Sequence, residues 1–124
     1  MIFHILKRDE WTHAVASGRY SPPSLAVEGF IHCSTIDQLI GTANGFFHGQ
    51  DGLAVLCIEE HLLTAPLKLE PPADAADARA KTLFPHIHGP LNLDAVAKVI
   101  DFPCEADGSF RMPDKLGNVA KSGV

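Results

Sequence analysis

The sequence predicts a single α+β domain. Helix signals fall early in the chain and strand signals dominate later, so the sustained strand–helix alternation of a doubly wound sheet is missing. The length of 124 residues matches one domain. The sequence contains neither a G-x-G-x-x-G turn nor a Walker lysine motif, which argues against a Rossmann fold and a P-loop.

The first half of the chain alternates between strand and helix signals. Residues 2–6 are rich in β-branched and aromatic side chains, which predicts a strand. Residues 9–16 start with acidic residues and end close to a glycine, as helices do. Two prolines are expected to keep residues 20–24 extended. A second strand is expected at residues 29–33, followed by a second helix with Ser34 as its N-cap.

The second half of the chain carries mostly strand signals. Residues 53–59 form an apolar run without alternation, which is typical of a buried central strand. Residues 67–70 alternate like a half-buried strand and end at two prolines. The pattern leaves residues 73–81 open as a helix or a loop. Residues 82–92 contain two prolines and a glycine and are expected to form a non-helical loop, and residues 97–102 the last strand.

The domain is expected to span residues 1–102. From Pro103 onwards the apolar pattern is lost, so residues 103–124 are expected to form a poorly ordered C-terminal tail. No apolar run approaches the ~18 residues of a membrane span, and the N-terminal residues do not resemble a secretory signal. A cytoplasmic protein is therefore expected.

Charge and cysteine usage exclude several function classes. Ten basic and fifteen acidic residues give a net charge of −5, which argues against a broad surface for nucleic acid or anionic membrane. The three cysteines are an odd number without C-x-x-C spacing, so neither a disulfide framework nor a cysteine-rich zinc site is expected. The oligomeric state stays open.

Histidines are the candidates for chemistry, because four of the seven lie in or beside apolar segments. His4 and His32 each occupy a short predicted strand, and two adjacent strands with one inward histidine each would form a site. His86 and His88 form an H-x-H pair in an extended segment, which places both imidazoles on one side. Such a pair binds a metal only with a third ligand from elsewhere, so a metal site remains the weakest alternative.

Two further polar residues are candidates. Ser34 and the amides after it lie where a helix begins, which suits a phosphate or a carboxylate. Glu70 ends a strand and could serve as a general base or stabilise a developing cation. Each residue also has a structural interpretation, as a helix cap and as a solvated carboxylate. Cys33 is not expected to be a nucleophile activated by His32, because neighbours in a strand point to opposite faces.

Several strings of residues carry a resemblance. The most specific are E-G-F-I-H-C-S at residues 28–34 and F-P-H-I-H-G-P-L at residues 84–91, accompanied by P-P-S-L at residues 22–25 and E-P-P at residues 70–72. Together they resemble a small bacterial family called domain of unknown function 952, over residues 1–102. The resemblance implies an ADP-ribosylation-like fold, which is a split, mixed β-sheet with two early helices around a cleft.

The same resemblance implies a ligand class. An NAD-like or ADP-ribose-like ligand is expected, with ADP-ribosyl- or phosphoribosyl-directed transfer as the reaction. The alternative is a non-catalytic module that binds a nucleotide or another small anion in the same pocket. In the enzyme interpretation Glu70 stabilises a ribosyl cation as nicotinamide leaves. The expected catalytic residues are His32, Glu70 and His86, and the expected ligand-binding residues are His4, Ser24 and Ser34.

Overall fold

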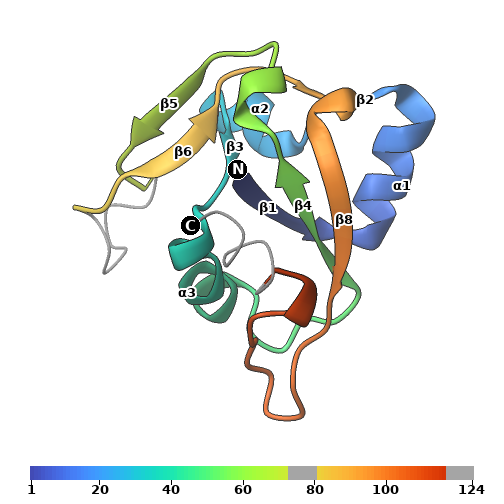
Figure 1. The fold of residues 1–124 in the computed structure, drawn as a ribbon, viewed down its shortest axis with the longest axis vertical. Helices are drawn as coiled ribbons and strands as arrows, with labels where there is room; N and C mark the ends of the chain where they lie inside the picture. The colour runs from blue at the N-terminus through green and yellow to red at the C-terminus, as the bar shows by residue number, and fades with distance from the viewer. Residues whose placement is uncertain (73–80, 117–124) are drawn as a thin grey trace.

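The computed structural model describes residues 1–72 and 81–116, which form an α+β fold with three small antiparallel sheets (Figure 1). The sheets have the strand orders β1-β4-β8, β2-β7 and β3-β6-β5. The described residues contain no helix long and apolar enough to cross a membrane. In chain order the elements are β1 (Ile2–Lys7), α1 (Arg8–Ser17), β2 (Arg19–Tyr20), α2 (Pro23–Glu28), β3 (Ile31–His32), α3 (Ile36–Phe46), β4 (Leu53–Ile58), η1 (Glu60–Leu62), β5 (Leu67–Glu70), β6 (Phe84–Ile87), β7 (Leu91–Asn92), η2 (Leu93–Ala95) and β8 (Val96–Phe102).

The β1-β4-β8 sheet is covered on both faces. All six residues of β4 are buried, as the apolar run predicts for a central strand. Side chains alternate across β1, so Ile2 and Leu6 join one apolar cluster while Phe3 and Ile5 join another. The helix α3 covers the second cluster through Leu39 and its neighbours. Each cluster therefore forms an apolar core on one side of this sheet.

The β3-β6-β5 sheet has one apolar face and one polar face. Ile31 and Ile87 are opposite each other in the register of β3 and β6, and both are fully buried in the first cluster. The neighbouring pair in the register, His32 and His86, consequently projects to the other face. A bridge between Phe3 and Ser34 links this region to β1. The small sheet thus lies next to β1 of the central sheet.

Two expectations about local structure are corrected. Residues 20–24 are not extended throughout, because Pro23 begins the helix α2, where a missing N–H costs nothing. That helix ends at Gly29 with φ of 87°, which shortens the expected strand at residues 29–33 to Ile31–His32. The expected loop at residues 82–92 contains β6 and β7 instead. The two prolines there exclude a helix, but their φ is compatible with extended backbone.

The N-cap of α3 is Thr35 and not Ser34. The Thr35 side chain and the Gln38 side chain form a reciprocal capping box at the start of this helix. Ser34 instead exchanges backbone hydrogen bonds of 2.8 Å with Phe3 in both directions. The Ser34 amide N–H, which was expected to face a phosphate, is therefore bonded to the Phe3 carbonyl oxygen.

The expected architecture needs three further corrections. Every strand pairing among the described residues is antiparallel, and the strands form three separate sheets rather than the expected mixed sheet. Three α-helices rather than two precede β4 in the described chain. Phe110 and Leu116 are buried in the second cluster, so the packed domain extends beyond Phe102. Residues 73–80 and 117–124, for which a helix or loop and a tail were expected, lie outside the described residues.

Candidate functional site

A cavity of about 730 Å³ lies between β1, α3 and the polar face of the β3-β6-β5 sheet. Most of its wall is apolar, and the lining residues in the described part of the chain include no Lys or Arg. Its polar lining side chains lie on β1, α2, β3, the connection from β3 to α3, α3 and β6: His4, Glu28, His32, Ser34, Thr42 and His86. Phenylalanines supply much of the remaining wall: Phe3, Phe30, Phe46, Phe47 and Phe84.

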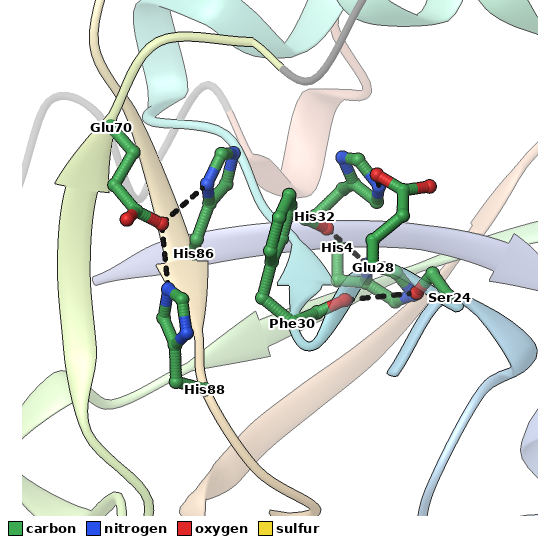
Figure 2. Close-up of polar contacts among 8 residues, drawn as sticks. All are labelled: His4, Ser24, Glu28, Phe30, His32, Glu70, His86 and His88. Carbon is green, nitrogen blue, oxygen red and sulfur yellow. Dashed lines mark hydrogen bonds and ion pairs between the residues drawn. The ribbon is translucent and has the colours of Figure 1, made fainter. Parts of the chain in front are cut away.

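Glu70 holds two histidines with one oxygen atom. Its Oε1 accepts hydrogen bonds from Nδ1 of His86 at 2.9 Å and from Nε2 of His88 at 2.6 Å (Figure 2). The antiparallel register of β5 and β6 places Glu70 opposite Phe84, two residues from His86 on the same face. The expectation that the H-x-H pair turns both imidazoles to one side is confirmed, since both reach the same atom.

The electrostatics of this group favour a neutral His86 beside an ionised Glu70. The hydrogen bonds from His88 and His86 lower the pKa of Glu70 below its usual value. Burial lowers the pKa of His86, and the hydrogen bond to Glu70 only partly offsets that effect. A carboxylate accepts but does not donate, so the proton of neutral His86 resides on Nδ1. The lone pair is then on Nε2 of a side chain that lines the cavity.

Phe30 organises the imidazoles around one aromatic ring. Its ring stacks on His86 with a centroid distance of 4.0 Å and an interplanar angle of 13°. The His32 ring meets Phe30 edge-on at 4.8 Å and His86 at 5.6 Å. Figure 2 shows Phe30 between the His86–Glu70 group and His32. Such stacking restricts the plane of the His86 ring and therefore the direction of its Nε2.

Glu28 forms a second carboxylate–imidazole pair with His32. Its Oε2 is 3.1 Å from Nε2 of His32, across the short connection from α2 to β3. Both residues line the cavity, and both side chains retain partial exposure to solvent. Ser24 does not line the cavity; its hydroxyl donates to the Phe30 carbonyl oxygen at 3.1 Å. Ser24 therefore positions the segment that carries Phe30.

His4 lines the cavity, but both of its ring nitrogens already have partners. Its Nδ1 donates to the His32 carbonyl oxygen at 2.5 Å, so its Nε2 accepts from the Tyr20 hydroxyl at 2.8 Å. Burial lowers the pKa of His4 to about 4, and burial raises the pKa of Tyr20. His4 is therefore a neutral bridge between β1, β2 and β3.

Ser34 and Cys33 form the inner part of the wall. The Ser34 hydroxyl donates to the Thr42 hydroxyl of α3 at 3.2 Å. Ser34 and Cys33 are both buried. Burial raises the pKa of the Cys33 thiol, so this cysteine is not a thiolate at neutral pH.

The structure brings most of the predicted site residues together. His4, His32, Ser34 and His86 line one cavity, whereas Glu70 lies behind His86 and Ser24 lies behind Phe30. The sequence analysis did not assign Glu28 or Phe30 to the site. The spacing of Glu28 four residues before His32 is the signal that could have found the pair. No group of three His, Cys, Asp or Glu side chains within residues 1–72 and 81–116 is arranged to hold a metal ion.

Comparisons with known proteins agree with this fold. The crystal structure of protein CC0527 from Caulobacter crescentus is 34% identical, with a TM-score of 0.78 over 94% of this chain and 97% of that chain. The solution NMR structure of CC0527 is 35% identical, with a TM-score of 0.76 and the same coverage. A comparison with curated proteins gives no match. The family model DUF952, described as protein of unknown function, matches residues 5–99, so the chain belongs to the DUF952 family.

Proposed function

We propose that the cavity binds a nucleoside-like ligand of the NAD class and that the protein acts on its ribosyl bond, with His86 as general base. The observation that carries this proposal is a 2% exposed imidazole at the cavity wall whose Nδ1 is held by a carboxylate, with burial lowering the pKa of His86. A carboxylate that fixes the tautomer and orientation of a histidine is the usual way to prepare it for proton transfer.

The shape and lining of the cavity support a ring-containing ligand. Its volume of about 730 Å³ falls in the range of small-molecule sites. Phenylalanine walls suit a flat ring such as nicotinamide, and His32 and His86 supply neighbouring polar groups whose ring centroids are 5.6 Å apart. The expected ADP-ribosylation-like architecture, which remains a prediction, favours the same ligand class.

The residues divide the work of such a reaction. A water or hydroxyl acceptor forms a bond to C1′ of the ribosyl group and gives its proton to Nε2 of His86. The glycosidic C1′–N bond breaks, and its electron pair goes to the ring nitrogen, so a nicotinamide leaves neutral without needing a proton. Glu28 is the carboxylate that lines the cavity and is placed to stabilise the developing cation. In this proposal Glu70, which was expected in that role, positions His86 through their hydrogen bond.

The described residues that line the cavity indicate which part of the ligand the protein recognises. Since its lining includes no Lys or Arg, and the Ser34 amide is bonded to Phe3, the described residues offer no strong phosphate clamp. We therefore expect the ring and ribosyl parts to contribute most of the affinity. Nicotinamide riboside is the minimal ligand that contains both.

The test compares Glu70→Gln with wild type. Titration calorimetry with nicotinamide riboside, NAD and ADP-ribose measures binding, and chromatography measures release of nicotinamide. We expect Glu70→Gln to bind like wild type but to turn over about 10²–10⁴-fold more slowly, because Gln cannot stabilise a protonated His86. Glu60→Gln, an exposed residue of η1, is the matched control.

Each result separates the alternatives. Wild-type protein that binds these compounds without turnover would be the non-catalytic binding module. Absence of binding by all three compounds would overturn the proposed ligand class.

A further inference from the structure

His88 is a feature of the site that the proposed reaction does not use directly. It does not line the cavity, and its side chain is 25% exposed, whereas that of His86 is 2% exposed. Its Nε2 nevertheless makes the shorter of the two hydrogen bonds to Glu70 Oε1. The carboxylate therefore connects a buried imidazole at the cavity with an imidazole nearer to solvent.

The backbone holds His88 firmly in this place. Its N–H donates to the Pro66 carbonyl oxygen at 2.8 Å, just beyond the end of β6. The next residue is Gly89, where a Cβ would lie 2.8 Å from the Cβ of Ala65. The absence of a side chain at Gly89 therefore allows the segments before β5 and after β6 to lie close together. The backbone around His88 therefore positions its side chain next to Glu70.

The N–H groups of His86 and His88 both donate to Oε1 of Glu70 and compete for its negative charge. Each N–H withdraws electron density from the Glu70 carboxylate, so the hydrogen bond from His88 weakens what the same oxygen offers to His86. Removal of the His88 donor would leave Glu70 with His86 as its remaining partner among the bonds described for it. The protonated form of His86 would then be better stabilised.

Other charged and titratable groups lie around His86 in the described part of the chain. His32 lies beside it on β3, with Glu28 behind that histidine. Lys68 of β5 is opposite His86 in the register and exposed to solvent. None of these three groups is bonded to Glu70 in the contacts described. A change at His88 can thus reach His86 through Glu70.

We propose that His88 is a positioning residue that sets the orientation of Glu70 and the strength of its hydrogen bond to His86. This inference rests on the proposed function, in which His86 is the base. In that function His88 keeps Glu70 from over-stabilising the protonated base, so that His86 is available in its neutral form near neutral pH.

The experiment measures the titration of His86 by NMR in three proteins: wild type, His88→Ala and His88→Gln. Gln keeps an N–H donor near the position of Nε2 but cannot titrate, whereas Ala removes the donor. We expect His88→Ala to raise the pKa of His86 on the order of one unit and His88→Gln to leave it near the wild-type value. In a Glu70→Gln background, His88→Ala should leave the pKa of His86 unchanged.

The result can overturn the inference independently of any turnover. Equal His86 titration in wild type and His88→Ala would refute it, as would an equal shift in His88→Ala and His88→Gln. If nicotinamide riboside is turned over, the acid limb of the pH–rate profile of His88→Ala should shift to higher pH, in step with the pKa of His86. If none of the proteins turns over ligand, the proposed function fails, and the NMR comparison still decides whether His88 acts on His86 through Glu70.

Discussion

The central β1-β4-β8 sheet and the small β3-β6-β5 sheet both contain a buried histidine, but they use it differently. His4 on β1 has both ring nitrogens bonded to uncharged groups, the His32 carbonyl and the Tyr20 hydroxyl. His86 on β6 has one nitrogen bonded to the Glu70 carboxylate, and its ring lines the cavity. Burial lowers the pKa of each histidine.

Two histidines that are both buried thus differ in the partners of their ring nitrogens. A histidine between neutral partners is stabilised in one tautomer and has no nitrogen left for a substrate. A histidine on a carboxylate can gain a proton, because the charge that forms has a partner. The histidine of the sheet with both faces covered therefore links three strands, whereas the histidine of the sheet with one open face lines the cavity beside a carboxylate.

The first prediction sharpens the contrast between the two sheets. Leu56 of β4 is fully buried opposite His4 in the register, whereas Leu69 of the edge strand β5 is 63% exposed. We expect Leu56→Ala to lower the free energy of unfolding by about 2–5 kcal/mol, through lost burial and a cavity. Leu69→Ala should change it by less than about 0.5 kcal/mol. Urea denaturation measures both, and similar losses would contradict the division into a core sheet and a site sheet.

Local sequence signals were sufficient to predict part of the fold. Apolar runs and alternation are local signals, so the strands at residues 53–58 and 67–70 were predicted with nearly correct bounds. The helix α2 was missed because Pro23 is equally compatible with extended backbone and with the first turn of a helix. Phe110 joins the core although no periodic pattern surrounds it.

The candidate site depends on register, which sequence does not display. The pairing of His32 with His86 arises from the antiparallel alignment of β3 and β6. The bond between Glu70 and His86 likewise requires the alignment of β5 and β6, which are separated by residues 71–83 in the chain. The residue types were visible in the sequence, whereas the position of Glu70 behind His86 and of Glu28 at the cavity wall needed the tertiary structure.

The second prediction concerns acid. The pKa of His4 is about 4 in the folded protein and 6.5 in an unfolded chain, so the unfolded state binds more protons between these values. Stability is then fully present above the unfolded pKa and is lost as pH falls from about 6.5 to about 4. The loss amounts to about 3 kcal/mol from this one group. Urea denaturation as a function of pH measures it.

A variant at the same position isolates the contribution of His4. His4→Gln retains an amide donor and acceptor but cannot take up a proton in this range. Its unfolding free energy should depend less steeply on pH than that of wild type over the same window. Parallel pH dependences in the two proteins would show that His4 is not the buried neutral bridge inferred from its two hydrogen bonds.

The third and smallest prediction tests why His4 has no nitrogen to spare. Tyr20→Phe removes the hydroxyl that donates to Nε2 of His4 and leaves a buried acceptor without that partner. We expect a loss of about 1–3 kcal/mol in unfolding free energy at neutral pH. The same change should raise the pKa of His4, because the neutral form loses a hydrogen bond. An NMR titration in which His4 of Tyr20→Phe still titrates as in wild type would mean that burial alone keeps this histidine neutral, and the contrast with His86 would then rest on Glu70 alone.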